Sequence, residues 1–209
     1  MKRQSIFTSI VVSIAFLFAS AHSLHAGLTN GDFSADLSVG WNIESGYVNW
    51  WLDSSARLAP DYDEDTYFQH STLSQVFTMD AGSQLLSFDL TMETGGGETD
   101  VFTAYLLDSS SDPLIHITGK DYFFSLSSDG DIEDELVSVT GDTISLNVSG
   151  LAVSNVKIVF DLEHDYGDDV DTYAFLDNVN VSLIPAPCAF VLGSIGVGFV
   201  AWLRRRRTF

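Results

Sequence analysis

The sequence predicts an all-β domain, built as a two-sheet antiparallel β-sandwich, over residues 27–184. Apolar and polar residues alternate there with a period of two, the pattern of strands that bury one face and expose the other to water. Segments rich in glycine, serine and aspartate separate the alternating runs, and no segment of this region shows a convincing helical period. About eight strands at this spacing favour a two-sheet sandwich.

Three segments carry the clearest alternation, namely 86–93, 143–149 and 156–163. Shorter apolar runs predict further strands at 41–52, 73–78, 101–107, 114–118 and 173–183. Trp41, which follows a glycine at the start of the first of these runs, is expected in the core.

The last predicted strand contains a charged residue in an apolar register. Its apolar parity comprises Tyr173, Phe175, Val179, Val181 and Leu183. Asp177 shares this parity, so it is expected to point into the core, where an unpaired carboxylate costs several kcal/mol. One interpretation is a metal ligand, because oxygen ligands suit a hard cation such as calcium. The other is a strand bulge that turns Asp177 outward, or hydrogen bonds from backbone amides.

Residues 1–26 have the organisation of a secretory signal peptide. Lys2 and Arg3 form a basic region, residues 6–19 form an apolar region, and small residues place cleavage after Ala21 or after Ala26. Ala26 leaves the cleaner start for a folded domain. We therefore expect export through the secretory translocon.

Residues 185–209 predict a short transmembrane helix with a basic end. Pro185, Ala186 and Pro187 precede an uncharged run at 188–203, and Arg204, Arg205, Arg206 and Arg207 follow it. A helix over this run would be about 24 Å long. That is a little short of a hydrocarbon core about 30 Å thick. The four arginines would hold the C-terminus in the cytoplasm.

This arrangement resembles the C-terminal signal of PEP-CTERM proteins, which joins a Pro-Glu-Pro-type motif, a short transmembrane segment and an arginine cluster. The match covers 184–207 and departs at Ala186, which stands where the family has glutamate. The resemblance implies handling by an exosortase, a membrane cysteine transpeptidase. The helix would enter the inner membrane transiently, and cleavage near the motif would release the domain to the cell envelope or extracellular matrix. An ordinary single-span anchor is the alternative.

The charge of the domain limits its partners. All twenty-nine acidic residues lie between Asp32 and Asp177, where the only basic residues are Arg57, Lys120 and Lys157. This balance excludes nucleic-acid binding, which needs a basic surface. It also repels acidic polysaccharide unless a cation bridges the two. The single cysteine, Cys188, lies in the apolar tail, so no disulfide can form within the domain.

The two ends of the domain resemble galactose-binding-like jelly rolls, a group that includes carbohydrate-binding modules. The matching residues are 28–33, Gly40 with Trp41, and 175–179 in the last strand. In those modules the first and last strands share a structural calcium ion. Carried over by position, the resemblance implies Gly31, through its backbone oxygen, and Asp177 as calcium ligands. Ser34 occupies the position of the family's glutamate, so Asp32 would have to supply that ligand.

Two adjacent tryptophans are candidates for ligand binding. Trp50 and Trp51 would point to opposite faces of a strand, so one of them should face outward. An exposed indole offers a flat apolar face to a sugar ring, unless a loop covers it. Three acidic clusters, at 61–65, 129–135 and 165–171, lack EF-hand spacing and are interpreted as solvated loops, with weak calcium binding as the alternative.

Catalysis finds little support in the sequence. Gly-x-Ser-x-Gly and His-Glu-x-x-His motifs are absent, and the domain has no cysteine nucleophile. The sequence therefore predicts a non-enzymatic envelope or matrix protein, either a structural component of extracellular polysaccharide or a protein that binds it. The alternatives are a calcium-dependent carbohydrate-binding module with specific glycan recognition, and a glycoside hydrolase, for which the many carboxylates single out no catalytic pair.

Overall fold

The computed structural model of the chain describes residues 27–51, 54–59, 70–79, 82–94, 100–151, 153–164 and 172–182, without the side chains of Trp51, Val153 and Ser154. These residues form thirteen strands, and none of them forms a helix long and apolar enough to cross a membrane. The strands are β1 (Asn42–Ser45), β2 (Tyr47–Trp51), β3 (Ser55–Ala59), β4 (His70–Met79), β5 (Leu85–Thr94), β6 (Val101–Leu107), β7 (Pro113–Ile115), β8 (Phe124–Ser127), β9 (Ile132–Glu133), β10 (Val137–Thr140), β11 (Thr143–Asn147), β12 (Val153–Glu163) and β13 (Thr172–Ser182).

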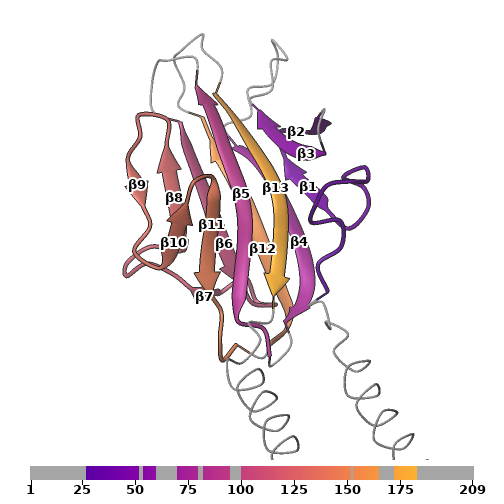
Figure 1. The fold of residues 1–209 in the computed structure, drawn as a ribbon, viewed down its shortest axis with the longest axis vertical. Coiled ribbons are helices and arrows are strands. Elements are labelled where there is room, and N and C mark those ends of the chain that lie inside the picture. Colours follow the sequence, from indigo (N-terminus) through magenta and orange to yellow (C-terminus); the bar gives the residue numbers. More distant parts are fainter. Residues whose placement is uncertain are drawn as a thin grey trace, which may run out of the picture.

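The strands build two sheets in which every pair is antiparallel. A seven-stranded sheet has the order β1-β4-β12-β6-β8-β9, with β7 paired to β6. A six-stranded sheet has the order β10-β11-β5-β13-β3-β2. Figure 1 shows β5 and β13 in one layer, in front of β4 and β12 in the other. The predicted two-sheet antiparallel sandwich is therefore confirmed.

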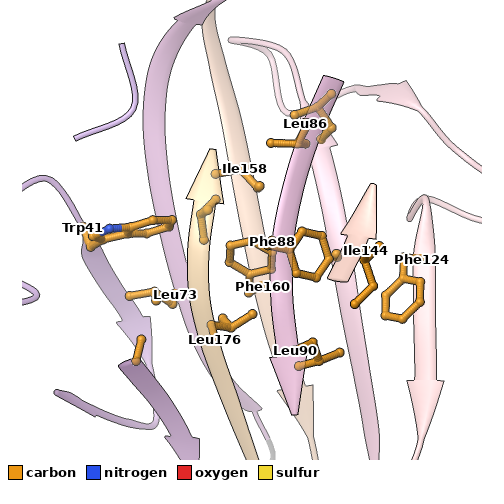
Figure 2. Packing of buried hydrophobic residues seen from close by; sticks show 14 of the residues in the cluster. Trp41, Leu73, Leu86, Phe88, Leu90, Phe124, Ile144, Ile158, Phe160 and Leu176 are labelled. Carbon is orange, nitrogen blue, oxygen red and sulfur yellow. The ribbon is translucent and has the colours of Figure 1, made fainter. Parts of the chain in front are cut away.

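The core lies between the sheets and is rich in phenylalanine. Phe160 of β12 and Phe88 of β5 meet across the interior with ring centroids 5.0 Å apart (Figure 2). Phe102 and Trp41 each lie 6.1 Å from Phe160 by the same measure. In the segments 86–93, 143–149 and 156–163 the apolar residues of one parity are buried: Leu86, Phe88, Leu90, Ile144, Leu146, Val148, Val156, Ile158, Phe160 and Leu162. The predicted alternation is confirmed in the first two segments, whereas Val159 and Asp161 of the opposite parity of β12 are buried as well.

The segment before β1 is joined to the last strand. The backbone carbonyl of Gly31 accepts a hydrogen bond of 2.7 Å from the Val179 amide of β13. The Trp41 indole donates to the Asn30 carbonyl at 2.9 Å, and its ring lies 5.2 Å from the Phe33 ring. Trp41 is buried, as the sequence predicts, so these contacts attach the N-terminal segment to the sandwich.

The inward parity predicted for the last strand is wrong over its first half. Ala174 and Leu176 point into the core, whereas Tyr173, Phe175 and Asp177 are half-buried on the outer face. The pairing of β13 with β5 shifts register between Asp177 and Asn180, and Asn178 has a φ of 51°. This bulge switches the buried parity, so that Val179 and Val181 face inward after it. Asp177 therefore faces away from the core.

Other strand boundaries also differ from the expectations. The predicted strand at 41–52 is two strands, because the chain turns at Gly46, which has a φ of 68° and where a Cβ would lie 2.4 Å from the His70 carbonyl oxygen. The strand expected at 114–118 ends at Ile115. Four short strands, β3, β8, β9 and β10, were not predicted.

Candidate functional site

The outer face of the six-stranded sheet contains a cleft of about 670 Å³. Its floor is formed by side chains of β3, β5 and β13 that alternate with the core residues. Three cross-strand pairs define it: Phe175 lies opposite Arg57, Tyr173 opposite Glu93, and Asp177 opposite Asp89. Side chains opposite each other in an antiparallel pair have Cβ atoms about 5 Å apart. The cleft therefore combines aromatic rings with charged groups at contact distance.

An arginine holds the aromatic side of the cleft in place. The Arg57 guanidinium carbon lies 5.0 Å from the centroid of the Tyr173 ring and 5.8 Å from that of Tyr47. Its Nε donates to Oδ1 of Asn49 at 3.1 Å. The rings of Tyr173 and Phe175 are 6.5 Å apart at an angle of 50°. The cation–π contact with Arg57 holds the Tyr173 ring, and the Phe175 ring lies beside it, so the two rings present an apolar surface.

Two aspartates occupy directly opposite positions on the floor of the cleft. Asp89 accepts hydrogen bonds from Oγ1 of Thr143 at 2.5 Å and from Nδ2 of Asn178 at 2.8 Å. Asp177 accepts one from the Asn178 amide at 2.6 Å. Like charges directly opposite each other destabilise a sheet. Burial raises the pKa of the Asp177 carboxyl, and the charges of Asp89 and Asp32 raise this pKa further, against the lowering effect of the Asn178 amide.

A second cleft of about 560 Å³ lies next to the first and shares Asp89 and Thr143 with it. Gly31 and Asp32, from the N-terminal segment, line its other side. Asp32 accepts hydrogen bonds from the Ser34 amide at 3.3 Å and the Ser34 hydroxyl at 3.0 Å. These bonds lower the pKa of Asp32. The shared residues place both clefts along one continuous strip of the sheet.

No protein-family model matches the chain, and no curated protein matches it significantly. Among solved structures, it is similar to the carbohydrate-binding module TmCBM27, described for its specific recognition of mannan, with a TM-score of 0.46, 12% identity and coverage of 74% of this chain and 95% of the module. It is also similar to the CBM22-1 xylan-binding domain of Paenibacillus barcinonensis Xyn10C, with a TM-score of 0.41, 13% identity and coverage of 78% and 99%. An exo-β-agarase matches with a TM-score of 0.43, 13% identity and coverage of 78% of this chain and 25% of the enzyme. None of these likenesses identifies a ligand for the clefts.

The predicted metal ligands line the two adjacent clefts. Gly31 and Asp32 line the second cleft, whereas Asp177 lines the first. The Gly31 carbonyl already accepts a hydrogen bond from Val179. Across the ranges that the structure describes, no group of three or more His, Cys, Asp or Glu side chains could hold a metal ion. Calcium binding by Gly31, Asp32 and Asp177 stays a prediction.

The two tryptophans predicted to bind ligand lie on β2, at the edge of the six-stranded sheet. Trp50 is 49% exposed and its indole donates to the Phe33 carbonyl at 2.7 Å. It lines neither of the two clefts. The backbone of Trp51 pairs with Ser55, and its side chain is outside the described part. A ligand role for either tryptophan stays a prediction.

Several predicted features fall outside the described residues. They are the signal peptide at 1–26, the tail residues Pro185, Ala186, Pro187 and Arg204 to Arg207, and the acidic clusters at 61–65 and 165–171.

Two histidines make structural contacts: His70 lies 2.8 Å from Asp161, and His164 lies 3.0 Å from Asp100. His116 is exposed after the end of β7 rather than within a strand.

Apart from Asp177, the residues that make the first cleft were not predicted as a site. Arg57, Asp89, Tyr173 and Phe175 are far apart in the sequence, and the apolar parity around the two aromatic residues predicted that they face the core. One signal was available. Arg57 is one of only three Lys or Arg residues in the domain. A basic residue that is so rare in an acidic domain is a candidate for a specific contact.

Removing the charge of Asp177 is expected to stabilise the protein at neutral pH. Its folded-state pKa is raised above the ordinary value of 3.8, so the folded state holds this proton more tightly than the unfolded chain. The free energy of unfolding therefore falls as the pH rises through this range. Asp177→Asn should raise the Tm at pH 7 in the presence of a chelator, and the difference from wild type should disappear below pH 3.8. Asp121→Asn, at an exposed position, is the control. An unchanged or lower Tm for Asp177→Asn at pH 7 would contradict this account.

Proposed function

We propose that this protein is a non-catalytic β-sandwich that binds extracellular polysaccharide in the cleft on its six-stranded sheet. The observation that carries the proposal is the fixed aromatic pair, Tyr173 and Phe175, beside carboxylates in an open cleft. A sugar ring has an apolar face that stacks on an aromatic ring, and hydroxyl groups that donate hydrogen bonds to carboxylates. The cleft supplies both kinds of partner in one place.

The aromatic rings provide the direct test. Tyr173→Ala and Phe175→Ala should each weaken binding at least about tenfold, which corresponds to about 1.4 kcal/mol, because each removes apolar contact area from the floor. Affinity electrophoresis through gels containing mannan, xylan or a mixed β-glucan measures this loss. Tyr122→Ala, a tyrosine in the loop before β8 whose side chain contacts Glu133, is the aromatic control and should retain binding. Equal retardation of all three variants and wild type would place the ligand elsewhere.

Trp50→Ala belongs in the same experiment, because Trp50 is an exposed aromatic residue that lines neither cleft. Loss of binding in this variant, with Tyr173→Ala unaffected, would move the site to the sheet edge.

A glycoside hydrolase fits this arrangement less well. Hydrolysis needs two carboxyl groups on either side of the scissile bond, at a set separation. Asp89 and Asp177 lie side by side on one floor, so both would approach a bound sugar from the same side. Turnover of any tested polysaccharide that Asp89→Asn and Asp177→Asn both remove would favour the hydrolase.

Export and processing are part of the proposal. The signal peptide and the PEP-CTERM-type tail support secretion, recognition by an exosortase and release into the cell envelope or matrix, where polysaccharide is available. The intact mass of the protein recovered from envelope and medium fractions tests this. A mass that corresponds to a chain ending near Pro187 supports processing. A mass that corresponds to a chain still containing the arginine cluster supports a membrane anchor.

Structural calcium is a second component of the proposal. The galactose-binding-like resemblance supports it, as does the attachment of the N-terminal segment to β13 through Gly31 and Val179. Asp32 and Asp177 would supply carboxylate oxygens. Adding calcium should raise the Tm, and a chelator should lower it to the metal-free value. A Tm that is identical under both conditions would exclude a calcium site.

A further inference from the structure

We infer that the glycan taken by this cleft is cationic: a polysaccharide whose sugars carry free amino groups. This inference rests on the proposed polysaccharide binding and specifies the chemical class of polysaccharide that the cleft binds. It depends on the balance of charge in the cleft, on the position of the aspartate pair relative to the aromatic rings, and on the contacts that Arg57 makes.

The lining of the cleft is mainly acidic, with carboxylates from β5, from β13 and from the turn before β11. Four carboxylates contribute to its lining, those of Asp89, Glu93, Asp142 and Asp177, against one guanidinium. That guanidinium, of Arg57, packs between two tyrosine rings and donates to Asn49. An anionic glycan would therefore meet repulsion, and Arg57 already has partners. A ligand bearing ammonium groups would instead gain a charge-assisted hydrogen bond from each contact with a carboxylate.

The aspartate pair lies where an amino substituent would be placed. Asp177 follows Phe175 by two residues on the same face of β13, and Asp89 is directly opposite Asp177. A sugar ring stacked on Phe175 therefore presents its substituents to both carboxylates. The pair brings two like charges together in a partly buried position, an arrangement that costs stability without a ligand. An ammonium group between them removes this repulsion and also gains from the adjacent aromatic rings.

The test compares two oligomers with the same sugar backbone, one with charged amino groups and one in which acetylation has converted them to neutral amides. Isothermal titration calorimetry is performed with a glucosamine oligomer and with the same oligomer fully N-acetylated, at pH 6 and low salt. Wild type should bind the amine form at least tenfold more tightly than the acetylated form. Asp177→Asn and Asp89→Asn should each reduce the affinity for the amine form at least fivefold. Asp121→Asn, which removes an equal charge at an exposed position away from the cleft, should change it less than twofold.

The control variant separates a specific site from general attraction to an acidic protein whose net charge is −20. Equal weakening in Asp121→Asn, Asp89→Asn and Asp177→Asn would overturn the inference, because attraction by overall charge predicts that result. Equal affinity for the amine and acetylated oligomers, or preference for the acetylated one, would also overturn it. In that case, binding that Phe175→Ala weakens would leave the proposed polysaccharide binding intact. Absence of binding to every glycan would contradict both.

Discussion

Gly31→Ala should destabilise the protein by about 3 kcal/mol or more, because the new methyl group has no space. A Cβ at this position would lie 1.8 Å from the Val179 carbonyl oxygen and 3.0 Å from its carbon. Both obstacles are backbone atoms of β13, so relief requires the N-terminal segment to move away from the strand. That movement would break the hydrogen bond between the Val179 amide and the Gly31 carbonyl. Chemical denaturation monitored by tryptophan fluorescence measures the loss.

Gly27→Ala is the matched control for this substitution. A Cβ at Gly27 meets nothing within 4 Å, so the same change of side chain should leave the free energy of unfolding almost unaltered. The two variants share the same gain of a methyl group and differ only in the space around it. Equal stability of Gly31→Ala and Gly27→Ala would show that the N-terminal segment is not packed against β13 as described.

Phe160→Ala should cost about 3–5 kcal/mol, the range for removal of a fully buried aromatic side chain. Phe160 of β12 is completely buried, and its ring meets those of Phe88, Phe102 and Trp41. At Phe160, β12 is paired with β4 on one side and with β6 on the other, and this pairing limits how far the backbone can move to fill the space. Thermal and urea unfolding should both report the loss.

Val76→Ala is the comparison for the core variant. Val76 belongs to β4 of the same sheet, but it is 59% exposed on the outer face. Its truncation should change stability by less than about 0.5 kcal/mol. A small effect for Phe160→Ala, similar to that of Val76→Ala, would contradict the position of the core.

The fold could be predicted because each central strand carries a long run of apolar residues in one parity. On β5 and β12 the buried apolar residues recur at every second position along much of the strand. A shift of the strand pairing by one residue would therefore expose all of them at once. The short outer strands carry no such signal. β10, for example, has exposed or half-buried residues only, and its sequence Val-Ser-Val-Thr is equally compatible with a loop. Local sequence cannot reveal a strand whose main contribution is backbone pairing with its neighbour.

The site could be predicted only in part, and β13 shows why. The chemistry of Asp177 marks it as unusual in an apolar register, but a single bulge at Asn178 changes which neighbours share its face. The bulge reverses the parity of Tyr173 and Phe175, so residues expected in the core form the cleft. Asn178 gives a weak signal, since asparagine tolerates positive φ. The pairing of Asp177 with Asp89 and of Phe175 with Arg57 depends on register between distant strands, which the sequence does not encode locally.

The most direct test of the central claim is a map of the ligand on the domain. Backbone amide NMR spectra of residues 27–184, recorded during titration with an oligosaccharide that binds, report which strands the ligand contacts. We expect the largest shifts on β3, β5 and β13 around Arg57, Asp89 and Phe175. Shifts confined to the outer face of the seven-stranded sheet, around Val76 and Asp161, would contradict it.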